Sequence, residues 1–261
     1  MPRARLPLLL CLLLSLVQAA AAGEARIALI IDDLGNDRAA GLRAVALPGP
    51  VTLAILPRTP HGARLARAAH ERGKGVMLHL PLEALGGAPL GPGGIGLHMD
   101  RYQFLRTLRE DLVSVPHARG VNNHMGSLLT RHPGAMAWLM RALRAYGLYF
   151  VDSRTTPATV AAQLAAEIGV PYRQRDVFLD HDPEPAAVAA EFERLIARAR
   201  QQGSAVGIGH PHPVTLAYLE RVLPQLRARG VELVPVTEIL EPSTRPGPPE
   251  LPWVAAGRPA D

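Results

Sequence analysis

The sequence has few of the residues that stabilise small cross-linked or metal-clustered folds. Its 261 residues include one cysteine, and only 4% of them are aromatic. A single thiol cannot form a disulfide framework or a zinc ribbon. The apolar content of 48% and the nearly balanced charges exclude a disordered chain. The chain is therefore long and apolar enough to bury a sizeable core without covalent cross-links.

The charge pattern gives no sign of a nucleic-acid partner. The sequence carries 28 basic and 23 acidic side chains, a formal net charge of +5, and Lys74 is its single lysine. No basic run is interleaved with aromatic residues, and no helix-turn-helix or RNA-binding motif is present. We therefore expect no nucleic acid as a partner, while the sequence leaves the oligomeric state open.

The N-terminal segment, residues 1–22, is typical of a secretory signal peptide. Arg3 and Arg5 precede an apolar run that ends at Val17, and small alanines follow. The run is shorter than the roughly 20 residues that span a membrane. We expect cleavage and no membrane span afterwards, with an uncleaved anchor as the alternative. Cleavage would remove Cys11 and leave a thiol-free protein in a bacterial periplasm or outside the cell.

The C-terminal segment, residues 241–261, holds six prolines and is predicted to be a disordered tail. Residues 24–240 remain as one folded domain. The Gly- and Pro-rich stretch Gly86–Gly96 is predicted to be a long loop within that domain.

Short β-branched runs alternate with amphipathic or alanine-rich stretches along the folded part. The predicted strands are Ile27–Ile31, Val51–Leu56, Gly75–Leu80, Gly120–Asn122, Leu148–Val151, Val177–Leu179, Ala205–Ile208 and Val231–Val234. The predicted helices are Pro60–Arg72, Arg101–Val113, Pro133–Tyr146, Pro157–Ile168, Pro185–Gln202 and Pro213–Arg229. This alternation indicates βαβ units and a parallel sheet. We predict an α/β fold, a single (β/α) barrel of seven or eight units, with a doubly wound open sheet as the alternative.

Polar side chains follow six of these predicted strands, at the point where each strand ends. They are Asp32 and Asp33; His79, with Glu83 four residues on; Asn122, Asn123 and His124; Asp152, Ser153 and Arg154; Asp180, His181 and Asp182; and His210 and His212. Because parallel strands end at one edge of a sheet, we expect a shared polar site there. For Asp180 and Asp182, capping of the following helix is the favoured interpretation.

Carboxylates and imidazoles without thiolates favour a divalent metal, zinc above all, with manganese or iron as alternatives. If the strand pleat continues, Asp32 and Asp33 point to opposite sides, so one can bind metal while the other has a second task. His79 and Glu83 share a helix face only if the residues between them are helical, which Pro81 opposes. His124 can complete three protein ligands with one open position.

The sequence lacks the motifs of a serine nucleophile and of a phosphate-binding loop. Ser127 does not lie in a G-x-S-x-G elbow, and neither does any other serine. The glycine-rich Gly91–Gly96 does not follow a predicted strand and lacks the Lys-Ser/Thr pair of a phosphate-binding loop.

Five segments together resemble the divergent polysaccharide deacetylase family. They are Ile30–Asp33 (IIDD), His79–Glu83 (HLPLE), Asn122–Ser127 (NNHMGS), Phe150–Ser153 (FVDS) and Gly209–Pro211 (GHP). They occur in order across Arg26–Leu240, nearly the whole predicted domain. The family is a distant branch of the metal-dependent carbohydrate esterases, which remove acetyl groups from glycans.

This resemblance implies a distorted (β/α) barrel and a metal-activated water that attacks an acetyl carbonyl. It implies that Asp32 is the base and His210 the general acid. The implied metal ligands are Asp33, His79 and His124, with Glu83 as an alternative ligand or a partner of the ligands. Asp152 and Arg154 would orient the acid or the substrate, and the implied substrate-binding residues are Asn123, Ser153 and His212. The classical esterases carry two histidines spaced by four, where this sequence has His79 and Glu83. They also carry an arginine-proline motif where this sequence has Asn122–Ser127.

The sequence thus predicts a secreted, zinc-dependent hydrolase that deacetylates an envelope or extracellular glycan. Its departures from the classical ligand set motivate an alternative, a glycan-binding or envelope protein that has kept the barrel and lost the chemistry. A metal-dependent amidase or phosphoesterase on the same barrel is a third interpretation.

Overall fold

A computed structural model describes residues 24–242, so the predicted signal peptide and most of the predicted tail lie outside the described residues. The strands are β1 Ala25–Leu34, β2 Thr52–Ile55, β3 Gly75–Leu82, β4 Gly120–Met125, β5 Tyr149–Asp152, β6 Tyr172–Gln174, β7 Val177–Phe178, β8 Ser204–Gly209 and β9 Val231–Leu233. The α-helices are α1 Arg38–Ala46, α2 Gly62–Glu71, α3 Arg101–Ser114, α4 Pro133–Tyr146, α5 Ala161–Ile168, α6 Pro185–Gln202 and α7 Pro213–Val222. Short 3₁₀ turns lie at Leu129–Arg131, Leu223–Gln225, Arg227–Arg229 and Val236–Glu238.

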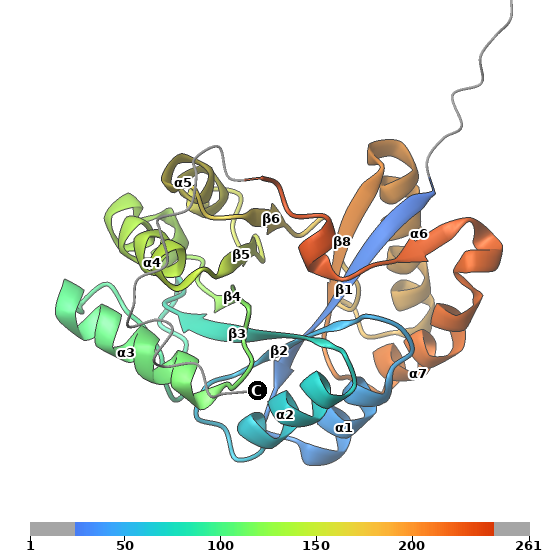
Figure 1. The fold of residues 1–261 in the computed structure, drawn as a ribbon, viewed down its shortest axis with the longest axis horizontal. Coiled ribbons are helices and arrows are strands. Elements are labelled where there is room, and N and C mark those ends of the chain that lie inside the picture. The colour runs from blue at the N-terminus through green and yellow to red at the C-terminus, as the bar shows by residue number, and fades with distance from the viewer. Residues whose placement is uncertain (1–23, 243–261) are drawn as a thin grey trace, which may run out of the picture.

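The strands form one parallel sheet in the order β6-β5-β4-β3-β2-β1-β8-β7, and β9 pairs with the first residues of β1. The sheet curls so that one face is enclosed, and the helices cover the outer face (Figure 1). A doubly wound sheet would carry helices on both faces. The prediction of a distorted (β/α) barrel is therefore confirmed.

The observed elements follow the sequence prediction with local differences. Helix α1 and strand β6 were not predicted, because α1 has a central glycine and β6 is short and half-buried. The predicted helix Pro213–Arg229 ends as an α-helix at Val222, and Pro224 lies in the 3₁₀ turn that follows. None of these differences moves a predicted site residue away from a strand end.

The enclosed face of the sheet forms a small core that leads to the polar strand ends. Ala28 and Ile30 of β1, Met77 of β3 and Ile208 of β8 belong to this inner core, whereas the intervening residues belong to the larger core beneath the helices. Side chains alternate between the two faces of a strand. The next inward positions along these strands are Asp32, His79 and His210, which form the polar layer above the apolar one.

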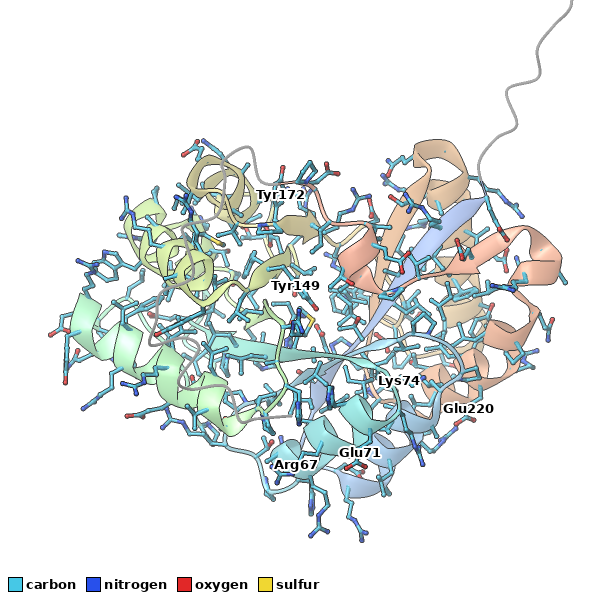
Figure 2. All side chains as sticks on the ribbon, viewed as in Figure 1. Arg67, Glu71, Lys74, Tyr149, Tyr172 and Glu220 are labelled. Atoms are coloured by element: carbon cyan, nitrogen blue, oxygen red, sulfur yellow. The ribbon has the colours of Figure 1, made fainter. Side chains whose placement is uncertain are left out.

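The opposite end of the barrel is closed by apolar side chains. Tyr149 lies inside the curl of the sheet, whereas labelled charged residues such as Glu220 lie on the outer helices (Figure 2). A Cβ at Gly120 would lie 2.2 Å from the Tyr149 ring, so this position requires glycine. Lys74 donates to the backbone carbonyls of Leu47 and Gly49 at this end. The predicted site residues lie instead at the carboxyl ends of the strands.

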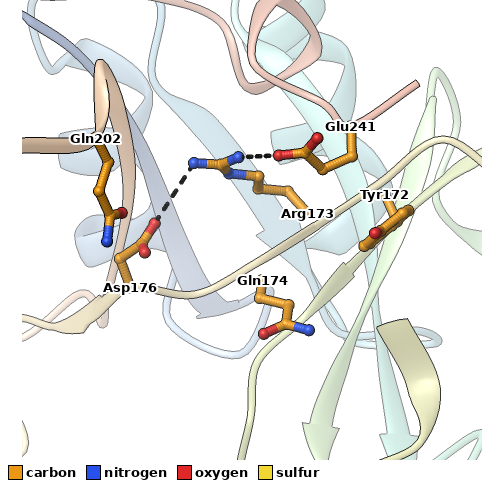
Figure 3. Close-up of a pocket in the computed structure, with 6 residues that line it drawn as sticks. All are labelled: Tyr172, Arg173, Gln174, Asp176, Gln202 and Glu241. Carbon is orange, nitrogen blue, oxygen red and sulfur yellow. Dashed lines mark hydrogen bonds and ion pairs between the residues drawn. The ribbon is translucent and has the colours of Figure 1, made fainter. Parts of the chain in front are cut away.

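Strands β6 and β7 follow each other in the chain but lie at opposite edges of the sheet, so they mark the open seam of the barrel. A cavity of about 270 Å³ lies there, lined by residues that include Arg173, Asp176 and Glu241 (Figure 3). The Arg173 guanidinium lies 2.5 Å from the Glu241 carboxylate and 3.2 Å from the Ser204 hydroxyl. Glu241, predicted to open the tail, instead pairs with Tyr172.

Among residues 24–242, no helix is both long and apolar enough to cross a membrane.

Candidate functional site

Three predicted metal ligands converge at the carboxyl ends of β1, β3 and β4. The Asp33 Oδ1 atom lies 3.1 Å from His79 Nε2 and 2.9 Å from His124 Nδ1. The two ring nitrogens are 3.2 Å apart. These three atoms form a nearly equilateral triangle, and ligands about 2.0–2.2 Å from one zinc ion are separated by a similar distance, roughly 3 Å.

Asp33 reaches this triangle because the pleat of β1 is broken. The pairing of β1 with β2 shifts register between Ile31 and Leu34, and Asp33 has a left-handed backbone with φ of 57°. Both Asp32 and Asp33 therefore face the same His79 nitrogen, at 3.6 Å and 3.1 Å. Asp32 and Asp33 were expected to point to opposite sides if the pleat of the strand continued. The pleat does not continue, because a β-bulge redirects the Asp33 side chain.

The donor set fits a divalent cation. Asp33 Oδ1 is buried, and its polar neighbours are the two imidazole nitrogens, which without a metal must supply protons to it. A buried carboxylate oxygen is costly unless protons or a cation compensate its charge. One carboxylate and two imidazoles, without a thiolate, suit zinc and similar transition metals. Asp33, His79 and His124 are therefore the residues that would hold the metal.

The electrostatics of the triangle keep Asp33 ionised. Burial opposes ionisation, but His124 and His79 outweigh it and hold the pKa of the Asp33 carboxyl well below its usual range. Burial likewise disfavours the protonated His79 ring, yet Asp32 and Asp33 outweigh it and raise the pKa of His79 to about 9. The metal-free site thus retains a proton on His79, which a metal would displace.

Asn122 of β4 links the base candidate to a ligand candidate. Its Oδ1 accepts from His79 Nδ1 at 2.8 Å, and its Nδ2 donates to Asp32 Oδ1 at 2.8 Å. Because Nδ1 is bound to Asn122, Nε2 is the His79 nitrogen that forms a corner of the triangle. Asp32 is 2% exposed, and burial raises its pKa, as suits a proton acceptor. Asn122 was expected among the polar strand-end residues but without a role; its inward position on the strand was the available signal.

His210 is held by Asp180, and not by the predicted Asp152. His210 Nδ1 donates to Asp180 Oδ1 at 2.9 Å, and its backbone N–H donates to Asp180 Oδ2 at 2.6 Å. The expectation that Asp180 caps the next helix is wrong, because Glu184 occupies the N-cap of α6. Its neighbour Asp182 also lies outside the cap position and accepts from the backbone of Glu184 at 3.2 Å.

The orientation of His210 brings its other nitrogen to the site. His210 Nε2 lies 3.8 Å from Asp33 Oδ2. Burial disfavours the charged ring, but Asp180 outweighs it and raises the pKa of His210. A protonated imidazole beside the ligand triangle can serve as a general acid.

Asp152, Asn123 and Ser153 shape the neighbouring turn. The two carboxylate oxygens of Asp152 accept from the backbone N–H of Arg154 and the hydroxyl of Thr159, at 2.8 and 2.9 Å. Asn123 Oδ1 accepts from the backbone N–H of Ser153 at 2.9 Å. The Ser153 hydroxyl lies 3.4 Å from Asn122 Nδ2. Asp152 therefore positions Arg154 and its loop, while the Arg154 side chain is exposed.

Glu83 and His212 lie apart from the triangle. Strand β3 continues through Pro81 to Leu82, so His79 and Glu83 do not share a helix face. The Glu83 carboxylate accepts from the backbone N–H of Leu97 at 2.6 Å. The geometry thus favours His124 over Glu83 as the third ligand. The exposed His212 lies beside His210, with ring centroids 5.6 Å apart, at the edge of the site.

The enclosed parallel sheet and its polar layer define a (β/α) barrel of the polysaccharide deacetylase type. The chain belongs to the divergent polysaccharide deacetylase family, whose pattern it matches over residues 29–240. It is 37% identical over 211 residues to the uncharacterised protein YibQ of Escherichia coli, which covers 81% of this chain and 66% of YibQ. A protein of Haemophilus influenzae is 36% identical to this chain, and the match covers 78% of this chain and 72% of that protein. The chain thus spans slightly less than two thirds of YibQ.

Solved structures share the fold. An uncharacterised protein from Agrobacterium tumefaciens superposes with a TM-score of 0.80 at 24% identity, covering 84% of this chain and 91% of its own. The catalytic domain of a peptidoglycan N-acetylglucosamine deacetylase from Eubacterium rectale gives 0.53 at 17% identity, covering 87% and 95%. A family 4 carbohydrate esterase pseudoenzyme from Bacillus anthracis gives 0.52 at 12% identity, covering 84% and 66%.

Proposed function

We propose that this protein is a metal-dependent deacetylase of an acetylated envelope glycan. The observation that carries the proposal is the convergence of Asp33, His79 and His124 next to two further titratable groups, Asp32 and His210. A ligand triangle flanked by a buried carboxylate and an imidazole supplies the parts of a hydrolytic site. Zinc is the proposed metal because the ligands are one carboxylate and two imidazoles.

When bound, a divalent metal supplies Lewis acidity and lowers the pKa of water. Asp32 accepts a proton from the attacking water at its carboxylate, whose second oxygen is held by Asn122. His210 donates the proton from Nε2 to the leaving amine or alcohol, because Asp180 holds Nδ1. The departing group then leaves neutral, and the acyl group leaves as acetate.

A site outside the cytoplasm is part of this proposal. Residues 1–22 have the pattern of a secretory signal, and the remaining sequence has no thiol. Export to a periplasm would bring the site to an envelope glycan. A fusion of residues 1–30 to an enzyme active only outside the cytoplasm tests this; an inactive fusion contradicts it.

The direct test measures acetate released from acetylated glycans by zinc-loaded protein. Wild-type protein is expected to release acetate, and Asp32→Asn is expected to lose at least about 100-fold in rate. Asp182→Asn is the matched control, since it changes an exposed aspartate at the same end of the barrel. Equal release by wild type and Asp32→Asn would overturn the proposed role of Asp32. Parallel assays of other amides and of phosphoesters distinguish deacetylation from other hydrolysis.

A non-catalytic glycan-binding barrel is the second candidate. The Bacillus anthracis neighbour with the same fold is a pseudoenzyme, and a mutant of that protein with restored enzymatic activity superposes with a TM-score of 0.52. The second candidate predicts glycan binding with no acetate release from any metal-loaded form. Zinc-dependent acetate release by wild type, and not by Asp32→Asn, would exclude this second candidate.

A further inference from the structure

Two arginines near the site, Arg154 and Arg175, make no ion pair with a carboxylate among the described residues, whereas several other arginines do. Arg43, Arg58, Arg173 and Arg229 each pair with an acidic side chain, at distances of 2.5–2.9 Å. Within residues 24–242, neither Arg154 nor Arg175 makes an ion pair. Arg154 Nη1 donates to the neutral amide oxygen of Gln174 at 2.8 Å, and Arg175 donates only to backbone carbonyls.

Arg175 is tied to both the turn after β5 and the acid side of the site. Its Nε donates to the Ser153 carbonyl at 2.7 Å and its Nη2 to the Arg154 carbonyl at 3.1 Å. Its guanidinium carbon lies 4.7 Å from the centre of the Phe178 ring. That ring stacks on His210 with centroids 5.1 Å apart. Arg175 is therefore one aromatic ring away from the proposed general acid.

Arg154 is held in place by its backbone, while its side chain is exposed. Its φ is 50°, a left-handed conformation that is strained for a residue with a side chain. Asp152 accepts from its N–H and Arg175 donates to its carbonyl, so both ends of the residue are fixed. The neighbouring Asp152 accepts from the backbone N–H of Arg154 and from Thr159, and not from the guanidinium. The remaining donors of Arg154 face solvent.

The two cations also disfavour each other. Burial and the neighbouring Arg154 lower the pKa of Arg175, and the carboxylates of Asp152, Asp32 and Asp176 only partly oppose this shift. The carboxylates near this pair accept no hydrogen bond from either guanidinium, whose printed partners are an amide oxygen and two backbone carbonyls. A bound anion could therefore form direct contacts that these carboxylates do not make. Guanidinium forks bind carboxylates through paired, charge-assisted hydrogen bonds. The pair thus has the chemistry of a carboxylate-binding subsite next to the reacting group.

We propose that Arg154 and Arg175 form a subsite for a carboxylate of the substrate, so that the protein selects an acidic acetylated glycan over a neutral one. Arg154 supplies the exposed fork, and Arg175 holds the loop and adds positive charge. This inference rests on the proposed glycan substrate, but it concerns binding and does not require turnover. Substrates then bind with the carboxylate over the end of β5 and the acetyl group over the Asp33, His79 and His124 triangle.

The test compares matched glycans in a binding measurement. Zinc-loaded Asp32→Asn protein is titrated calorimetrically with a tetrasaccharide of alternating N-acetylglucosamine and N-acetylmuramic acid. The comparison ligand is the same tetrasaccharide with each carboxylate converted to a methyl amide. We expect the acidic form to bind at least about tenfold more tightly, because a charge-assisted fork is lost in the amide. Added salt should reduce this ratio.

Variants assign the preference to Arg154. In the same background, Arg154→Gln should abolish the ratio, and Arg154→Lys should retain part of it, since lysine keeps the charge without the fork. Arg198→Gln, an exposed arginine on α6, is the matched control and should leave the ratio unchanged. Equal affinities for the two tetrasaccharides, or an unchanged ratio in Arg154→Gln, would overturn the subsite. Acidic preference without acetate release would refute only the proposed activity, whereas acetate release without acidic preference would refute only the subsite.

Discussion

Asp180 holds His210 at both its ring and its backbone, with 2.9 Å to Nδ1 and 2.6 Å to the main-chain nitrogen. Thr215 donates to the same carboxylate at 2.8 Å. The three contacts leave Nε2 as the free nitrogen of the imidazole, directed toward the carboxylate of Asp33 at 3.8 Å. The orientation of the proposed general acid is thus decided by a residue that follows a different strand.

Replacing Asp180 by asparagine should lower kcat by about 100-fold, because His210 loses the carboxylate that stabilises its charge and orients its ring. Burial lowers the pKa of His210 and Asp180 raises it, so the substitution leaves burial opposed only by the carboxylates of Asp32 and Asp33. A general acid works below its pKa, so the alkaline limb of the kcat profile should move to lower pH. Thr215→Val is the graded control and should cause a smaller loss. An unchanged alkaline limb in Asp180→Asn would contradict this role.

The ligand triangle predicts which substitutions remove the metal. Asp33→Asn and His79→Gln should each weaken zinc binding by more than about 100-fold, because each removes a donor from the triangle. Glu83→Gln should retain zinc, since its carboxylate binds the Leu97 backbone. Elemental analysis after dialysis measures the bound metal. Full occupancy in Asp33→Asn, or loss in Glu83→Gln, would show that the ligands are different.

Proton release should accompany metal binding. In the metal-free protein the pKa of His79 is raised to about 9, so the ring is protonated near neutral pH. A metal ligand must be neutral, and zinc binding at about pH 7 should release about one proton. Calorimetry in two buffers of different ionisation enthalpy counts this proton. His79→Gln is the control, and equal apparent enthalpies in both buffers for wild type would contradict the prediction.

The raised pKa of His79 also predicts how the stability of the metal-free protein depends on pH. The folded pKa of His79, about 9, exceeds the unfolded value of about 6.5. The stabilisation from this group is complete below about pH 6.5 and is lost as pH rises through about 9. Denaturant titrations of metal-free wild type and His79→Gln should therefore diverge least at alkaline pH. A constant difference across this range would contradict the shift.

Asp111 of α3 predicts a second pH effect, away from the site. The residue is fully buried, and one carboxylate oxygen is 2.8 Å from Arg58 Nε while the other has no partner among the described residues. Burial outweighs Arg58 and raises the pKa of Asp111 to about 7. The folded state therefore binds a proton that the unfolded state has released, and stability from this group falls as pH rises from about 4 to about 7.

Asp111→Asn should remove this slope. The free energy of unfolding of the variant relative to wild type should rise by ~1–2 kcal/mol between about pH 5 and about pH 8, because the variant has no buried carboxyl to ionise. Glu110→Gln is the matched control, since Glu110 is half exposed and pairs with the same Arg58. Denaturant titrations at the two pH values provide the measurement. Parallel curves for wild type and Asp111→Asn would refute the shift.

Much of the fold follows from local pattern. Alternation of β-branched runs with proline-initiated helices predicted the barrel, and the period of two along β1 and β8 leads from Ile30 and Ile208 directly to Asp32 and His210. Strand ends of a parallel sheet meet at one edge whatever the details of packing. For this reason the sequence alone groups Asp33, His79 and His124. The short strand β6 and the alanine-rich α1 gave no comparable periodic signal.

The pairing of site residues is a different matter, because it depends on register and local backbone conformation. The sequence by itself determined the family, the barrel and the set of polar strand ends. Only the tertiary structure decided that a bulge turns Asp33 toward His79, that Asn122 bridges His79 and Asp32, and that Asp180 takes the place expected for Asp152. Periodicity specifies which face of a strand a side chain occupies, whereas an ångström-scale contact also requires the register between strands and the φ of single residues.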